Sequence, residues 1–270
     1  MNWKKVVTLG MAALTLVAFT AGCGSDTNKA DTQTLPKKIV IGLDDNYPPM
    51  GFRDEKGNLV GFDIDMAKEA AKRAGMEVEF KPIDWDSKEA ELKSKHIDVL
   101  WNGLTVTEER KQNMAFTKPY LKDKQIIVVR KDSPINSKEQ LEGKIVGTQQ
   151  GSTGETVMEK DPFTKKIKEV KKYGDYVNAF MDLKLGRIDA MVVDGIVGNY
   201  TMSKEPGEFR AVTGSDYGSE DNAIGLRKED TALREKLNSI LGDMMKDGTA
   251  DKLAEKWFGT SALLDKDAYK

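Results

Sequence analysis

The segments 91-ELKSKHIDVLW-101 and 182-DLKLGRIDAMV-192 decide the fold. In both, a helical pattern runs through a Lys-containing turn into an Ile-Asp strand. Each segment belongs to a series of strands that alternate with short helices. Such alternation predicts parallel strands with helices on the faces of the sheet. Because the series occurs twice, we expect an α/β protein of two lobes, each a mostly parallel sheet flanked by helices.

The first series runs outward from the first segment. We expect strands at 37–45, 76–83, 97–103 and 124–131, and helices at 61–75, at 87–95 and from residue 107. Asp63 or Asp65 should start the helix at 61–75, and Gly75 should end it. Pro48 and Pro49 prevent the first strand from continuing, because proline lacks the N–H that a ladder needs.

The second series surrounds the second segment. We expect strands at 144–150, 168–174 and 187–194, a helix from about Glu155 and a helix at 176–186. The C-terminal segments 233–248 and 250–259 have apolar residues at helical spacing, so they should form helices that pack on one of the lobes.

The first 23 residues have the pattern of an export signal. Two lysines precede an apolar run from Val6 to Phe19, and small residues lead to Cys23, the only cysteine of the chain. This resembles a bacterial lipoprotein signal, although Thr20 stands where leucine is usual. We expect a signal peptide at 1–22 and a lipid such as palmitate on Cys23, with a flexible tether over 23–36. The alternative is an ordinary signal with a chance cysteine.

Composition limits the partners. The chain has 270 residues with a formal net charge of -2, and 32% of its residues are charged. No strongly basic stretch is present, which argues against a nucleic-acid partner. A single cysteine excludes an intramolecular disulfide. After the signal, no stretch is long and apolar enough to span a bilayer.

Loops at the carboxyl ends of the expected strands should form the binding site. One of them is 103-GLTVTEER-110, where Thr107 suits an N-cap and Arg110 would lie in the first helical turn. The helix dipole opposes a cation at that place. Arg110 is therefore either a solvated helix residue or the binding residue for an anion, with the hydroxyl of Thr105 nearby.

The other strand-end loops carry further candidates. In 148-TQQGSTGE-155, hydroxyls and backbone N–H groups at a helix start could hold an anion, although the loop lacks the lysine of a nucleotide-binding motif. Asp194 and Asp44 each end a strand and could receive a cation; their alternative role is capping or turn formation. Tyr47 and Trp85 could enclose a flat or aliphatic group, or could be core aromatics.

Six segments together resemble the polar amino-acid-binding proteins of ATP-binding cassette importers, of the glutamine and lysine/arginine/ornithine type. They are IGLDDNYPPMGF, GNLVGFDIDMAKEAAKRAG, LKSKHIDVLWNGLTVTEERKQNMAFTKPY, GKIVGTQQGSTGE, GRIDAMVVD and EKWFG. The resemblance implies two lobes with a two-strand hinge, a type II periplasmic-binding-protein fold. It places lobe one at 37–122 and 220–270 and lobe two at 123–219, with crossings near 122–126 and 217–222.

The resemblance also implies a role for each candidate. Arg110 matches the residue that binds the ligand carboxylate, and Asp194 matches the one that binds the ammonium group. The remaining matches are Thr105 and the Gly103 backbone in the first cradle, Thr153 in the second, the enclosing rings of Tyr47 and Trp85, and the side-chain readers Asp44 and Gln149. Trp101 and Asn102 depart from the small residues usual before Gly103.

The resulting expectation is a monomeric, exported lipoprotein on the outer face of the bacterial cytoplasmic membrane. It would capture a free L-amino acid by hinge closure and deliver it to a membrane permease. Asp44 and the rings favour arginine or another basic ligand, with glutamine or cystine next. Two alternatives stay open: a ligand-sensing lipoprotein, and a dehydratase-like enzyme on the same fold.

The residues argue against the enzyme. His96 is the only histidine, and it lies in a lysine-rich turn where it should be solvated. No nucleophile–base pair and no metal-ligand cluster is evident. We therefore expect no catalytic residue, no cofactor and no metal.

Overall fold

The computed structural model describes residues 35–270, and lobe one is built on its first sheet. That sheet has the order β5-β1-β6-β13-β7. Its strands are β1 (Lys38–Leu43), β5 (Glu77–Pro82), β6 (Val99–Leu100), β7 (Ala115–Phe116) and β13 (Gly225–Leu226). The apolar residues Ile39, Ile41 and Leu43 of β1 are completely buried. Strand β1 is parallel to β5 and β6, whereas β13 is antiparallel to β6 and β7.

Lobe two is built on a second sheet, of order β10-β9-β11-β8-β12. Its strands are β8 (Leu121–Arg130), β9 (Ile145–Gln149), β10 (Glu169–Tyr173), β11 (Ala190–Asp194) and β12 (Phe209–Asn222). Strand β9 is parallel to β10 and β11, whereas β8 is antiparallel to β11 and β12. Both sheets are therefore mixed. The antiparallel pairs are β8 with β11 and β12, and β13 with β6 and β7.

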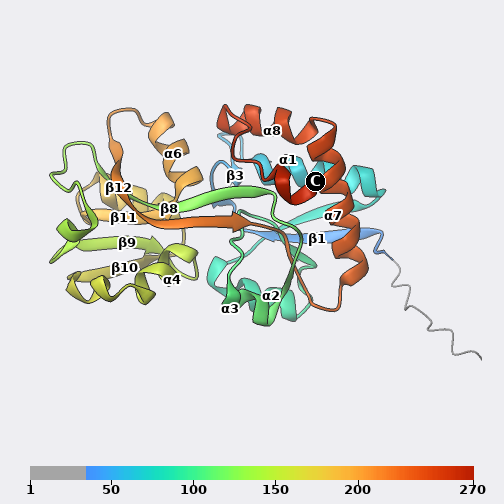
Figure 1. The fold of residues 1–270 in the computed structure, drawn as a ribbon, viewed down its shortest axis with the longest axis horizontal. Coiled ribbons are helices and arrows are strands. Elements are labelled where there is room, and N and C mark those ends of the chain that lie inside the picture. The colour runs from blue at the N-terminus through green and yellow to red at the C-terminus, as the bar shows by residue number, and fades with distance from the viewer. Residues whose placement is uncertain (1–34) are drawn as a thin grey trace, which may run out of the picture. The chain divides into compact units, whose positions relative to one another are not determined.

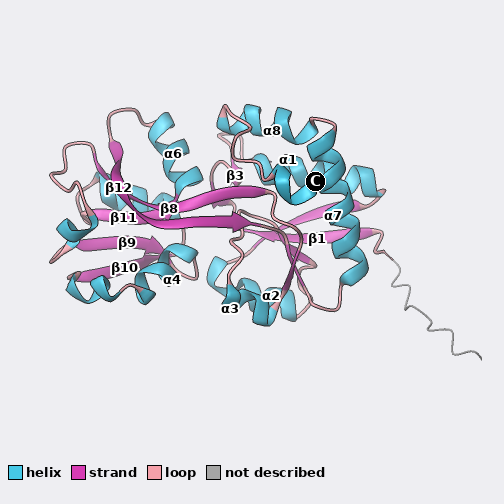
Figure 2. Ribbon diagram, in the orientation of Figure 1, coloured by secondary structure: helices cyan, strands magenta, loops and turns pink. Residues whose placement is uncertain are grey.

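Helices flank the strands of both lobes (Figure 2). Lobe one carries α1 (Phe62–Ala74), α2 (Lys88–Lys93), α3 (Glu108–Asn113), α7 (Thr231–Lys246) and α8 (Thr249–Phe258). Helices α7 and α8 pack against α1. Lobe two carries α4 (Thr153–Lys160), α5 (Tyr176–Lys184) and α6 (Gly195–Lys204). A small third sheet contains β2 (Asn46–Tyr47), β3 (Gly51–Arg53) and β4 (Leu59–Val60).

Two helix starts were predicted wrongly, and one helix was missed. Helix α1 begins at Phe62 after Gly61, so neither Asp63 nor Asp65 caps it. Helix α4 begins at Thr153, two residues before the predicted start. Helix α6 was not predicted, because two glycines and β-branched residues weaken its helical propensity. It forms because it packs on β8 and β11.

Strands β8 and β12 form a two-strand hinge between the lobes. They run side by side from one lobe to the other (Figure 1). Their register pairs Lys124 with Ser219 and Leu121 with Asn222, where the chain was expected to cross. The lobe boundaries at 122/123 and 219/220 stay a prediction.

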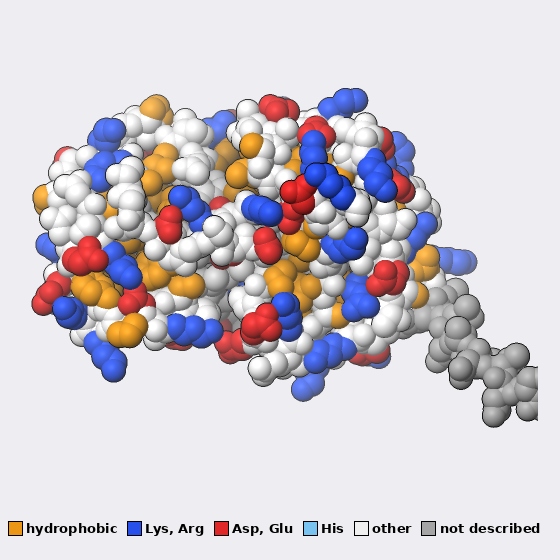
Figure 3. All heavy atoms as spheres, in the orientation of Figure 1, with side chains coloured by type: hydrophobic (Ala, Val, Ile, Leu, Met, Phe, Trp, Pro, Cys, Tyr) orange, Lys and Arg blue, Asp and Glu red, His pale blue; other side chains and the backbone are white. Residues whose placement is uncertain are grey.

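The predictions for the signal peptide and Cys23 lie outside the described residues, as does most of the tether. No helix within residues 35–270 combines the length and apolar character needed to cross a membrane. On the face shown in Figure 3, basic and acidic side chains are interspersed over both lobes.

Candidate functional site

A small cavity between the lobes collects the predicted residues. It is lined by Tyr47, Trp85, Gly103, Thr105, Arg110, Gln149, Ser152, Thr153 and Asp194. Eight of these nine were candidate site residues in the sequence, and Ser152 supplies one of the hydroxyls expected in the loop 148–155. The predicted residue Asp44 does not line the cavity. It accepts a hydrogen bond at Oδ2 from Nε2 of the lining residue Gln149, at 2.7 Å. The cavity holds about 10 Å³, close to the minimum for one water molecule.

Arg110 is buried, with 6% of its surface exposed, so it is not a solvated helix residue. Thr107 caps α3 by accepting a hydrogen bond from the Arg110 N–H at 3.1 Å, as predicted. The guanidinium Nη1 donates to Thr105 O at 2.9 Å and to Thr153 Oγ1 at 3.3 Å. Burial lowers the pKa of Arg110. Among the described residues no carboxylate forms an ion pair with it, so a buried positive charge faces the cavity with only neutral acceptors.

Asp194 supplies the opposite charge. It is buried at the end of β11, and its side chain does not cap α6. Instead Oδ1 accepts a hydrogen bond from Gln125 Nε2 at 2.7 Å. The carboxylate oxygens of Asp123, Asp194 and Glu220 lie within 4.8 Å of one another. Burial, and then the charge of Asp194, raise the pKa values of Asp123 and Glu220 well above their ordinary range. Two of the three carboxyl groups beside the cavity therefore hold their protons more tightly than an ordinary carboxylic acid does.

Asp44 and Gln149 face each other across the lobes. Asp44 Oδ1 accepts from the Asn46 N–H at 2.8 Å, and its own N–H donates to Asn102 Oδ1 at 3.0 Å. Gln149 Nε2 also donates to Gly174 O at 2.9 Å. Burial raises the pKa of Asp44 to about 6, and the bonds from Asn46 and Gln149 oppose that rise. Asn102 therefore positions Asp44, and this end of the site is already satisfied within the protein.

The aromatic candidates Tyr47 and Trp85 are both buried and both line the cavity. Tyr47 is also packed against Tyr176, with ring centroids 6.0 Å apart. The ammonium of Lys88 lies 5.2 Å from the centre of the Trp85 ring. Each ring is thus held by a neighbour, which fixes its orientation at the cavity.

Gly103 is required by its backbone conformation. Its φ is 56°, and an added Cβ would lie 3.1 Å from the Tyr47 ring. Its N–H donates to Asp63 Oδ2 at 2.7 Å, and its carbonyl accepts from Asn222 Nδ2 at 2.6 Å. The N–H is therefore not available to a ligand, whereas the carbonyl has a second lone pair to offer.

The second cradle lies at the start of α4. Ser152 caps this helix by accepting from the Glu155 N–H at 3.1 Å, while Thr153 faces Arg110. Gln125, Tyr176 and Lys88 were not predicted as part of the site. Gln125 and Tyr176 gave no sequence signal. Lys88 did, because it lies in the first turn of a predicted helix, as Arg110 does. His96 lies outside the site and is exposed, as expected.

Comparisons with known proteins agree with this architecture. The chain is 34% identical over 265 residues to the L-cystine-binding protein TcyJ of Escherichia coli, covering 94% of this chain and 98% of that one. A histidine-bound substrate-binding protein of an ABC uptake transporter from Streptococcus pneumoniae has a TM-score of 0.80 and 37% identity, covering 84% of this chain and 94% of that one. An ancestral arginine-binding protein bound to arginine has a TM-score of 0.78 and 43% identity. The match covers 84% of this chain and 100% of that one.

The fold and the interlobe cavity define a two-lobed binding protein with a type II periplasmic-binding-protein fold. Residues 39–260 match one family model over most of the chain, and the chain belongs to that family, the bacterial extracellular solute-binding proteins, family 3. The relatives above are named as binding proteins, so the enzyme alternative is set aside.

Proposed function

We propose that this protein captures a free L-amino acid and delivers it to the permease of an ABC importer. One observation carries the proposal: within residues 35–270 Arg110 is buried without an ion-pair partner, and Asp194 lines the same cavity. A zwitterion supplies the two charges that these residues require. Its carboxylate would take the donors of Arg110 and Thr105. Its ammonium would take Asp194 and the Gly103 carbonyl.

Capture would proceed by hinge closure. The cavity is far smaller than an amino acid, so the lobes must separate to admit one and then close around it. Lobe one would bind first through Arg110, Thr105 and the rings. Lobe two would then add Thr153 and Asp194. Only contacts that differ between the open and closed forms can drive closure.

The ligand is proposed to be arginine or another basic amino acid, with glutamine and cystine as the next candidates. Asp44 and the two rings support a basic side chain. The ancestral arginine-binding protein also has a structure with glutamine bound, and TcyJ is named for cystine. These neighbours support both runners-up.

A thermal-shift screen tests the proposal. The twenty amino acids, ornithine and cystine would be added to the purified protein. At least one α-amino acid should raise the melting temperature, while the matching amine without a carboxylate should not. A protein whose melting temperature no amino acid changes would contradict amino-acid capture.

We also propose that the protein is exported and held on the outer face of the cytoplasmic membrane by a lipid on Cys23. The apolar run before this single cysteine supports the anchor. In Cys23→Ser, labelled fatty acid should no longer be incorporated and the protein should be released into the surrounding fluid. Equal retention of both forms on the membrane would refute the anchor.

A further inference from the structure

Lys88 is a second buried cation beside the site. It is 4% exposed, and its Nζ donates to Trp85 O at 3.1 Å and to Gly151 O at 2.7 Å. It forms no ion pair within the part of the chain that the structure describes. It is also the first residue of α2, where the helix dipole opposes positive charge. An ammonium group is therefore buried where two effects disfavour it.

The burial of Lys88 depends on both lobes. Trp85 belongs to lobe one, whereas Gly151 precedes α4 of lobe two. The seam is tight, since a Cβ added at Gly151 would lie 2.8 Å from Asp86 Cα. Gln150 Nε2 closes the same seam by donating to Asp86 Oδ2 at 2.9 Å. Separation of the lobes would remove Gly151 and return the Lys88 ammonium to water.

Lys88 and Arg110 share one acceptor. The Gly151 carbonyl that accepts from Lys88 also accepts from Arg110 Nη2 at 3.2 Å. Two positive groups therefore lie within a few ångströms of each other in the closed seam. Burial, and then the charge of Arg110, lower the pKa of Lys88 to about 8. Three neighbouring acids oppose this only in part: Glu89, Asp86 and Glu155. A carboxylate bound to Arg110 would compensate both charges.

We propose that Lys88 gates closure: its ammonium opposes the closed form until the carboxylate of a ligand lies beside Arg110. This inference rests on the proposed function and deepens it, because it makes the ligand carboxylate a condition of closure as well as a contact. A neutral side chain at residue 88 would relax that condition, since the lobes could then close without burying a second cation.

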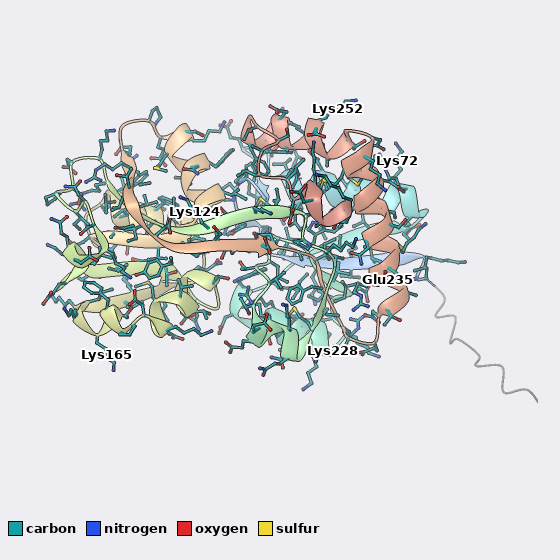
Figure 4. All side chains as sticks on the ribbon, viewed as in Figure 1. Lys72, Lys124, Lys165, Lys228, Glu235 and Lys252 are labelled. Carbon is teal, nitrogen blue, oxygen red and sulfur yellow. The ribbon has the colours of Figure 1, made fainter. Side chains whose placement is uncertain are left out.

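The first test measures closure without ligand. Figure 4 shows Lys72 and Lys165 on different lobes. Both are exposed, so cysteines at these positions can carry a fluorescent pair in a full chain with Cys23→Ser. Lys88→Met should raise the closed population by about threefold or more over the parent. Lys93→Met, an exposed lysine on the same helix, should leave it unchanged. An equal or smaller closed population in Lys88→Met would overturn the gate.

The second test measures discrimination by calorimetry with arginine, glutamine and their α-carboxamides. The parent should bind the free amino acids much more tightly than their α-carboxamides. In Lys88→Met the ratio of these two affinities should be roughly tenfold smaller. An unchanged preference would overturn the gate. If the parent binds no amino acid, the proposed function fails, while the ligand-free measurement still decides the role of Lys88. If Lys88→Met does not fold, Lys88→Gln replaces it in both tests.

Discussion

The two ends of the site differ in how their charges are satisfied. At one end, the Arg110 guanidinium is buried, and in the part of the chain that the structure describes it bonds only to carbonyl and hydroxyl oxygens. At the other end, the Asp44 carboxylate is buried and already accepts hydrogen bonds from Gln149 and Asn46. The first end lacks an anion, whereas the second is complete within the protein.

This difference separates the part of the function that the site determines from the part that it leaves open. A buried cation without a counter-ion specifies what the ligand must bring, namely a carboxylate. A satisfied carboxylate is less specific, because a ligand must compete with Gln149 to reach Asp44. The structure therefore supports the amino-acid class more strongly than it supports any particular side chain.

The largest effect should follow from Arg110→Ala. The ligand carboxylate would be buried without its partner, so affinity should fall by ~100-fold or more, several kcal/mol. Isothermal titration calorimetry with the preferred amino acid measures this loss. Lys111→Ala is the matched control, because Lys111 is the exposed neighbour on α3. An affinity within threefold of the parent would mean that Arg110 does not bind the carboxylate.

A smaller effect should follow from Asp44→Asn, and it tests the opposite end. If Asp44 binds a cationic side chain, the affinity of the variant for arginine should be lower by about tenfold or more, and its affinity for glutamine by less than about threefold. An amide can still pair with an amide, but it leaves a guanidinium uncompensated. Asp45→Asn is the control, because Asp45 pairs with Arg53, whereas Gln149 bonds to Asp44. Equal losses for both ligands would refute the cationic pocket.

Much of the site could be predicted because its signals are local. An arginine in the expected first turn of a helix was the signal at Arg110, and Thr107 marked the start of that helix correctly, although α3 is so short that Arg110 also lies in its last turn. In open α/β sheets ligands bind at the carboxyl ends of the strands, and this rule alone predicted that Asp194 and Thr153 would lie near Arg110. The alternating elements predicted both lobes, although a pattern of single strands does not reveal which neighbours are antiparallel.

The remainder depended on contacts between distant segments. Gln149 and Asp44 are 105 residues apart in the chain, and their hydrogen bond exists only where the lobes meet. Lys88 carried the same first-turn anomaly as Arg110, but its lysine-rich helix is typical of a solvated surface. Its burial results from Gly151 in the other lobe. Asp63 looked like a helix cap, but it bonds to Gly103 and Tyr120 instead.

The smallest effect should be a pH dependence at the Asp44 end. Burial raises the pKa of Asp44 to about 6 when the lobes are closed without a ligand. A cation bound there would favour the ionised carboxylate and lower its pKa, so binding below pH 6 must release a proton. The affinity for arginine should therefore fall as the pH decreases, by up to about tenfold between pH 7 and pH 5. Above pH 7 Asp44 is almost fully ionised, so its titration should no longer change the affinity for arginine.

The control for this pH dependence is Asp44→Asn, which has no carboxylate to titrate at that position. Its arginine affinity should vary less with pH than that of the parent, and the difference between the two profiles isolates Asp44 from Asp123 and Glu220. Calorimetry at several pH values, with glutamine as a neutral ligand, gives both profiles. Parallel profiles for parent and variant would show that Asp44 does not meet the charge of the ligand. In that case the Arg110 end would recognise the charge of the ligand, whereas the Asp44 end would recognise only its shape and its hydrogen-bonding groups.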